Sequence, residues 1–234
     1  MEALITAGGS SRRLGGGMNK LFVTICGMPV LMHSVLAFSK CPSISSITIA
    51  AEARLHPMIR TMLASWSVKG PVRLAPGGET RQRSVANMLA MTDPDTDAVC
   101  VHDGARPMLC AADLEAMAKA FINGSDDGLV SCSRVSDTLK RIGPDGLIEL
   151  TVPRDNLIAV QTPQIFRRGF LMAALEAAEA DGYEGTDESS LAERLGGRTR
   201  AYFQPAENLK ITYEKDVETA RTLMEFRGAM HGRQ

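Results

Sequence analysis

The sequence predicts an α/β fold in which helices cover both faces of a doubly wound, mostly parallel β-sheet. Three observations predict it. Strand-like and helix-like segments alternate along the chain, the strand candidates are short and apolar, and a glycine-rich loop directly follows the first of them. The chain has 234 residues, 44% of them hydrophobic and 23% charged, which suits one α/β domain with a sizeable core. We therefore expect a single domain over residues 1–234.

Apolar runs and helical periodicity locate the elements. The expected strands are residues 3–6, 44–50, 72–75, 98–102 and 128–133. The expected helices are residues 29–39, 56–65, 81–91, 112–123, 167–181 and 214–226, and Pro29 suits the first turn of the first helix. Ligands of parallel sheets bind at the carboxyl ends of the strands. The glycine loop follows the first strand, so we expect it at that edge.

Residues 137–161 interrupt the alternation. A Gly143-Pro144-Asp145-Gly146 turn lies between two alternating runs, which predicts a β-hairpin inserted at about 135–160. A hairpin cannot easily bury both of its faces by itself, so it is a candidate arm for a partner subunit. The residues are equally consistent with a hairpin that folds back on its own domain.

Composition excludes several classes of protein. The net charge of −1 lacks the basic excess of a nucleic-acid binder. No run approaches the length of a membrane span, and the apolar start is too short for a signal peptide. The five cysteines are odd in number and form no C-x-x-C pair, which indicates free thiols in a reducing compartment. We expect a cytoplasmic protein with neither a nucleic-acid nor a membrane partner.

The loop over residues 7–20 has the composition of a polyphosphate site. Its glycines let the backbone approach a ligand closely, and free backbone N–H groups there form an anion-binding concavity. Arg13 and Lys20 add two positive charges, which suits a polyphosphate that is attacked at phosphorus. The loop has neither the G-x-G-x-x-G order nor the ending of a P-loop. The alternative is a surface loop with solvated basic residues.

A second candidate lies at the end of the strand over 98–102. Asp103 next to Gly104 can reach a hydroxyl group or a hydrated metal ion. Arg106 can donate two hydrogen bonds to a phosphate. We interpret His102 as a packed strand residue rather than a general base.

Three further segments carry candidate ligand contacts. Residues 77–81 precede a helix for which Thr80 is a plausible N-cap, and Ser84 follows in its first turn. This loop either starts a helix or reads the edge of a base. Residues 159–164 form an extended polar stretch. Lys210 lies in an otherwise strand-like run, where it is either a surface residue or a phosphate contact.

These segments together resemble one family. The motifs VHDGARP at 101–107, AVQTPQ at 159–164, GTDESSL at 185–191 and NKLF at 19–22 resemble the 2-C-methyl-D-erythritol 4-phosphate cytidylyltransferase family. The resemblance covers about residues 3–220, in the family's order. It implies a Rossmann-like sheet of the nucleotidyltransferase type. It also implies that CTP and 2-C-methyl-D-erythritol 4-phosphate give 4-(cytidine 5'-diphospho)-2-C-methyl-D-erythritol and pyrophosphate, with Mg²⁺ bound alongside CTP. This reaction belongs to nonmevalonate isoprenoid biosynthesis.

The resemblance implies a role for each site residue, with the metal ligands unassigned. Arg13 and Lys20 would stabilise the transition state, and Thr162 and Lys210 would hold the attacking phosphate. The backbone of Ala7, Gly8 and Gly9 would hold the triphosphate and base, while Gly78, Glu79 and Ser84 would read cytosine. Asp103, Gly104 and Arg106 would lie between CTP and the sugar phosphate. Thr138 and Arg154 would reach the sugar phosphate of the other subunit, which implies a homodimer joined through the hairpin arm, with Arg154 part of the catalytic set.

Other functions remain open at this point. A ribitol-5-phosphate cytidylyltransferase shares the loop chemistry and uses a similar polyol phosphate. A molybdopterin nucleotidyltransferase shares the start of the loop, but VHDGARP and the hairpin are not expected in it. A catalytically inactive nucleotide sensor would bind CTP without releasing pyrophosphate, and the intact set of charged residues argues against it.

Overall fold

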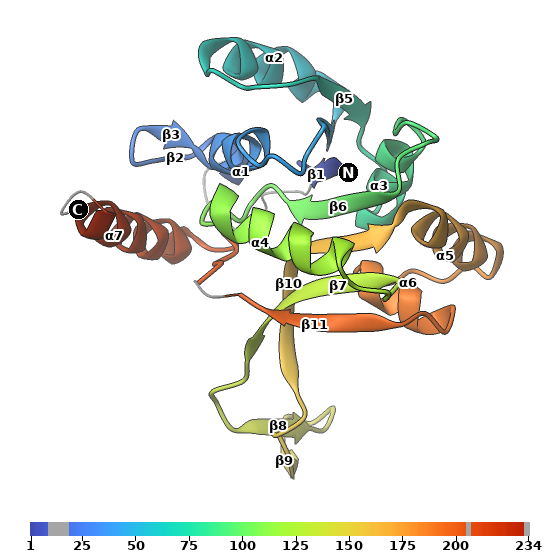
Figure 1. Cartoon of the computed structure of the whole chain (residues 1–234). Helices are drawn as coiled ribbons and strands as arrows, with labels where there is room; N and C mark the ends of the chain where they lie inside the picture. The colour runs from blue at the N-terminus through green and yellow to red at the C-terminus, as the bar shows by residue number, and fades with distance from the viewer. Residues whose placement is uncertain (9–18, 205–206, 232–234) are drawn as a thin grey trace.

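Seven strands form the central sheet, in the order β11 (Thr199–Phe203), β7 (Gly128–Arg134), β10 (Ile158–Arg167), β6 (Ala98–Asp103), β1 (Glu2–Thr6), β4 (Ser46–Ala51) and β5 (Val72–Pro76). The structure is a computed structural model that describes residues 1–8, 19–204 and 207–231. Neighbouring strands pair in parallel except at β10, which is antiparallel to both β6 and β7 (Figure 1). The expected mostly parallel sheet is confirmed.

Helices cover both faces of this sheet. One face carries α1 (Val30–Ser39), α2 (His56–Ser65) and α4 (Ala111–Ile122), and the other carries α3 (Arg81–Leu89), α5 (Arg168–Ala180) and α6 (Glu188–Arg194). The alternation of side chains along a strand produces this division. In β1, Ala3 and Ile5 join the core of the first face, while Leu4 joins that of the second. The helix α7 (Glu214–His231) packs near the short strands β2 (Thr24–Ile25) and β3 (Met28–Pro29).

Four segments differ from the sequence expectation. The polar stretch 159–164 is part of β10, a central strand, and the strand β11 and helix α6 are additional elements. The strand-like run at 207–212 is not a strand. It lies instead across the end of β6, where the Ile211 N–H donates to the Ala105 carbonyl at 2.8 Å. Within the part of the chain that the structure describes, no helix is long and apolar enough to cross a membrane.

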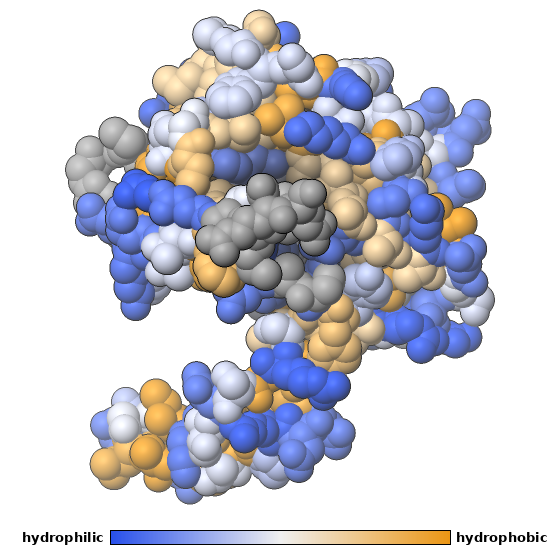
Figure 2. All heavy atoms as spheres, turned by 60° about the vertical axis from the view of Figure 1, so that its left-hand side comes forward, coloured by the Kyte–Doolittle hydropathy of each residue, from blue (hydrophilic) through white to orange (hydrophobic). Residues whose placement is uncertain are grey.

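Residues between β7 and β10 leave the sheet and form a separate antiparallel pair, β8 (Leu139–Ile142) and β9 (Ile148–Val152). Figure 1 shows this pair below the sheet, at the end of long extensions of β7 and β10. Figure 2 shows hydrophobic side chains gathered on it. Ile142, Leu147 and Ile148 are each more than 60% exposed. An apolar surface of this kind, set apart from the core, is typical of a contact with another chain.

Candidate active site

The candidate site lies at the carboxyl edge of the sheet. The strands β1 and β6 are adjacent and end side by side, with Thr6 paired to Asp103. The antiparallel direction of β10 brings its first half to the same edge, where the Asp103 N–H donates to Thr162 Oγ1 at 3.0 Å. A hollow of about 270 Å³ opens here. It is lined by Arg81, Asp103, Arg106, Val160, Gln161, Thr162, Gln164, Thr186, Asp187 and Lys210.

The Asp103 carboxylate lies among three cations. Its Oδ1 accepts from Arg81 Nε at 3.0 Å, its Oδ2 is 2.7 Å from Lys210 Nζ, and Arg106 Nε lies 3.8 Å from Oδ2. The Asp103 side chain is 9% exposed. Burial by itself would raise the pKa of Asp103, but Arg81, Lys210 and Arg106 outweigh it and hold the pKa below its usual range. Asp103 is therefore a carboxylate throughout the physiological pH range, and it gathers three cations that are suited to binding phosphate groups.

Arg81 links this carboxylate to a second one. Its Nη1 and Nη2 donate to Glu188 Oε1 and Oε2 at 2.6 and 3.0 Å. Burial would lower the pKa of Arg81, but Glu188 and Asp103 raise it above its usual value. The sequence prediction included Arg81 only as part of the loop before α3, and Glu188 only within the GTDESSL motif. No local periodicity relates two residues that are 107 positions apart.

Arg106 and Lys210 are held by the segment that crosses the end of β6. Arg106 Nη1 donates to the Asn208 carbonyl at 2.7 Å, and Asn208 Nδ2 donates to the Thr162 carbonyl at 2.5 Å. Asn208 is buried. This explains how a lysine outside any strand reaches Asp103. Asn208 is a structural residue of the site that the sequence prediction included only as part of the run at 207–212.

His102 packs beneath the site, as the sequence predicted. It is fully buried against Phe38, with ring centroids 5.3 Å apart. Its Nε2 lies 3.3 Å from the Arg106 carbonyl and its Nδ1 lies 3.2 Å from Thr162 Oγ1. Burial lowers the pKa of His102 to about 3. A neutral ring donates from Nε2 to the carbonyl and accepts the Thr162 proton at Nδ1. The Thr162 hydroxyl group then donates to His102 Nδ1 and accepts from the Asp103 N–H, so both of these hydrogen bonds stay within the protein.

The loop before α3 is folded by Ser84. The Gly78 N–H donates to Ser84 Oγ at 2.9 Å, and Ser84 Oγ donates to the Thr80 carbonyl at 3.0 Å. Thr80 caps the helix by accepting from the Arg83 N–H, as predicted. A Cβ at Gly78 would lie 2.5 Å from Arg83 Cβ, so the turn requires glycine. Ser84 therefore shapes the loop through its hydroxyl group, and the side chain of Glu79 in this loop is exposed.

The loop after β1 approaches the same helix. Ala7 is buried, and its N–H donates to the Ala50 carbonyl at 2.8 Å. A Cβ built on Gly8 would lie 4.0 Å from Ser84 Oγ, which places the start of the loop beside α3. Gly104 packs against the end of β1, because its N–H donates to the Thr6 carbonyl at 3.0 Å and a Cβ there would lie 3.1 Å from that oxygen. The predicted nucleotide-contacting residues around β1 and α3 are thus neighbours in space.

The remaining predicted site residues are not among the described residues that line the hollow around Asp103. Gly9 and Arg13 lie outside the described residues. Lys20 begins a short 3-10 helix, η1 (Lys20–Phe22), which Asn19 caps by accepting from the Leu21 N–H at 3.1 Å. Thr138 and Arg154 are exposed on the hairpin segments and do not line the hollow of their own chain.

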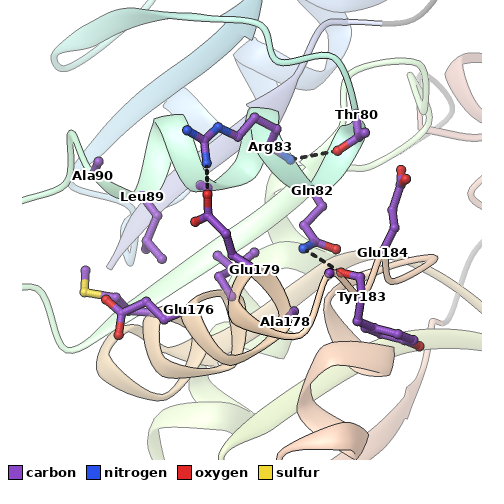
Figure 3. A pocket seen from close by; sticks show the side chains of 14 residues that line it. Thr80, Gln82, Arg83, Leu89, Ala90, Glu176, Ala178, Glu179, Tyr183 and Glu184 are labelled. Atoms are coloured by element: carbon purple, nitrogen blue, oxygen red, sulfur yellow. Dashed lines mark hydrogen bonds and ion pairs between the residues drawn. The ribbon is translucent and has the colours of Figure 1, made fainter.

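A second hollow, of about 450 Å³, lies between α3 and α5 (Figure 3). Its described lining is mainly apolar and includes one cation, Arg83, which donates to Glu179 at 2.7 Å. Gln82 Nε2, on α3, donates to the Tyr183 carbonyl at 3.2 Å across this hollow. It is larger than the hollow at the sheet edge but lacks the converging cations around Asp103. We therefore assign the chemistry to the smaller hollow.

Comparison with known proteins identifies the family. Residues 1–226 match the model of the IspD family, 2-C-methyl-D-erythritol 4-phosphate cytidylyltransferase. The chain belongs to this family. A 2-C-methyl-D-erythritol 4-phosphate cytidylyltransferase of Symbiobacterium thermophilum is 39% identical over 225 residues, which cover 96% of this chain and 93% of the relative. The corresponding protein of Bacillus pumilus is 36% identical over 96% of each chain.

Solved structures of the cytidylyltransferase family have the same fold. The crystal structure of 4-diphosphocytidyl-2C-methyl-D-erythritol synthase from Anaerococcus prevotii matches with a TM-score of 0.84 and 26% identity, over 96% of this chain and 95% of that one. The cytidylyltransferase of Thermus thermophilus matches with a TM-score of 0.77 and 27% identity, over 95% and 97% of the two chains. The sheet with its single antiparallel strand is therefore the fold expected of a family member.

Proposed function

We propose that this chain transfers a cytidylyl group from CTP to 2-C-methyl-D-erythritol 4-phosphate and releases pyrophosphate. A phosphate oxygen of the acceptor forms a bond to the α-phosphorus, and the bond between that phosphorus and the leaving pyrophosphate breaks. The observation that supports this proposal most directly is that Arg81, Arg106 and Lys210 surround Asp103 at the carboxyl end of β6. Positioning and charge stabilisation are most of what such a transfer requires of a protein.

The two substrates would occupy opposite sides of Asp103. The backbone around Ala7, Gly8 and Gly9 would hold the triphosphate and base, and the loop of Gly78 and Glu79, folded by Ser84, would read cytosine. Arg13 and Lys20 would stabilise the charge that develops at the α-phosphorus. Lys210 and Arg106 would face the acceptor phosphate across Asp103 and Gly104. Thr162 would fix this side of the site through its bonds to Asp103 and His102.

A divalent cation, Mg²⁺, would enter with CTP. Mg²⁺ is commonly bound by one or two carboxylates together with substrate phosphates. Asp103 and Asp187 are the carboxylates in the described lining of the hollow. Asp187 caps α6, and both oxygens of Asp103 face cations, so either carboxylate would have to exchange a protein partner for the ion. The bound ion would add positive charge at the phosphates of CTP.

We also propose that the chain acts as a cytoplasmic homodimer, folded as one domain with the hairpin as its arm. Thr138 directly precedes β8 and Arg154 follows β9, and the arm would carry both to the sugar phosphate held by the other subunit. The apolar side chains of the arm, including Ile142 and Ile148, would be covered by that contact.

Replacing Arg154 with alanine tests the arm. We expect the KM for the sugar phosphate to rise about tenfold or more, since a hydrogen bond to a charged group is worth about 1.5–3 kcal/mol. The KM for CTP should stay unchanged, because the base loop belongs to the other subunit's core. Arg141→Ala, on β8 of the same hairpin, is the control. Unchanged kinetics in Arg154→Ala would remove the arm from the active site.

The function itself is tested by pyrophosphate release. Purified protein, Mg²⁺ and CTP are combined with 2-C-methyl-D-erythritol 4-phosphate, with ribitol 5-phosphate, or with no acceptor. Release with the methylerythritol phosphate alone is the expected result. Release with ribitol phosphate would keep the mechanism and change the substrate. If neither acceptor supports release while CTP binds, the chain is a nucleotide sensor rather than an enzyme.

A further inference from the structure

Glu188 is the most buried carboxylate beside the site, yet it does not line the hollow. Its side chain is 1% exposed, and it lies in the first turn of α6. Its partner Arg81, from α3, does line the hollow. A buried carboxylate is costly unless its oxygens are paired, and both oxygens of Glu188 accept from Arg81. The pair therefore joins two helices at the wall of the site.

The geometry of Arg81 connects Glu188 to Asp103. The two Nη atoms of Arg81 face Glu188, and Nε faces Asp103 Oδ1 at 3.0 Å. Because the guanidinium group is planar and rigid, fixing its Nη edge also fixes the direction of Nε. Asp103 Oδ1 is thereby occupied, and Oδ2 is left to face Lys210 at 2.7 Å.

The start of α6 is itself tied to the sheet. Asp187 caps the helix by accepting from the Ser190 N–H at 2.9 Å, and it accepts from Gln164 Nε2 at 2.8 Å. Gln164 Oε1 accepts from the Ser189 N–H at 3.1 Å. Gln164 is fully buried in β10, two positions after Thr162. These bonds fix the start of α6, and with it Glu188, relative to β10, the strand whose Thr162 accepts from the Asp103 N–H.

We propose that Glu188 is a positioning residue for the transfer reaction, acting through Arg81 to orient the carboxylate of Asp103 toward Lys210. The inference rests on the proposed function. Without the Glu188 carboxylate, Arg81 gains freedom to turn toward Asp103 Oδ2 or an incoming phosphate and to displace Lys210. The loop of Gly78 and Ser84 keeps its own hydrogen bonds, so CTP binding persists while the reacting groups lose alignment.

Glu188→Gln is the decisive variant, with Glu179→Gln as its matched control. Glu179 also pairs with an arginine of α3, Arg83, but both side chains are more than half exposed (Figure 3). We expect Glu188→Gln to lower kcat about 10- to 100-fold, since small misplacements of reacting groups cost up to about 100-fold. The KM for CTP should change less than about threefold, the mark of an interaction that acts on turnover rather than on binding. Glu179→Gln should match the wild type.

A double-mutant cycle separates positioning from folding. If Glu188 acts through Arg81, Arg81→Met combined with Glu188→Gln should have the same kcat as Arg81→Met alone. Glu188→Asp, which keeps the charge, should recover part of the loss. Arg81→Met with Glu188→Leu replaces the pair by apolar side chains and should restore the unfolding temperature without restoring kcat.

A wild-type kcat in folded Glu188→Gln would overturn the positioning role. A wild-type kcat in the folded variant that combines Arg81→Met with Glu188→Leu would overturn it as well. A rise in the KM for CTP that accounts for the whole loss would overturn it also, because Glu188 would then serve binding. Absence of pyrophosphate release by the wild type with any acceptor would overturn the proposed function and this inference together. Pyrophosphate release by the wild type, together with a wild-type kcat in Glu188→Gln, would overturn the inference alone.

Discussion

Lys20→Ala is expected to lower kcat by about 10²–10³-fold, the loss typical of removing one group that stabilises developing charge. The KM for CTP should change much less, because charge at the α-phosphorus increases in the transition state. Lys20 opens η1, whose Asn19 cap and buried Leu21 hold the backbone in place. Steady-state pyrophosphate release at varied CTP measures both constants.

Lys119→Ala is the control for Lys20→Ala. Lys119 lies on α4, is 68% exposed and pairs with Glu115, so its loss should leave both constants unchanged. Equal losses of CTP affinity and turnover in Lys20→Ala would contradict the prediction. They would show that Lys20 binds the ground state and the transition state equally.

Asp103→Ala is expected to destabilise the protein by about 3–5 kcal/mol, the usual cost of removing one partner from a buried ion pair. The substitution leaves Arg81, Arg106 and Lys210 around one site without their central carboxylate. Urea unfolding of the variant and the wild type measures the difference. Pyrophosphate should recover part of the stability of the variant, because an anion can take the place of the carboxylate.

Glu179→Ala is the control for this prediction. It breaks an exposed pair and should cost less than about 1 kcal/mol. A loss below about 1 kcal/mol in Asp103→Ala would mean that the three cations relax into solvent, and the site would then be less rigid than its geometry indicates.

The segment 159–164 shows where sequence reasoning reached its limit. Its polar residues indicated an extended stretch, but it belongs to a strand in the middle of the sheet. The first part of β10 faces the hollow through Gln161 and Thr162, whereas Ile165 is fully buried in the core. Pro163 lies where the register with β7 shifts, at a position that needs no ladder N–H. One strand thus has two environments, which a single periodicity cannot reveal.

The sequence by itself determined the strands β1, β4, β5, β6 and β7, the helices that follow them other than α6, and the loops at the carboxyl ends of the strands. Hydrophobic periodicity and turn residues are local properties, so they are readable from neighbours along the chain. It also indicated Asp103 and Arg106 as site residues, since charges that follow an apolar strand are brought to the carboxyl edge of the sheet. The resemblance to the family indicated Lys210.

Only the tertiary structure decided which of these charges meet. Arg81 and Glu188 pair across 107 positions, and Lys210 reaches Asp103 from a segment that is not a strand. The order of the sheet places antiparallel β10 between β6 and β7 and so brings Thr162 to Asp103. Such contacts depend on how distant elements pack to bury apolar surface, and no local pattern of residues encodes that arrangement.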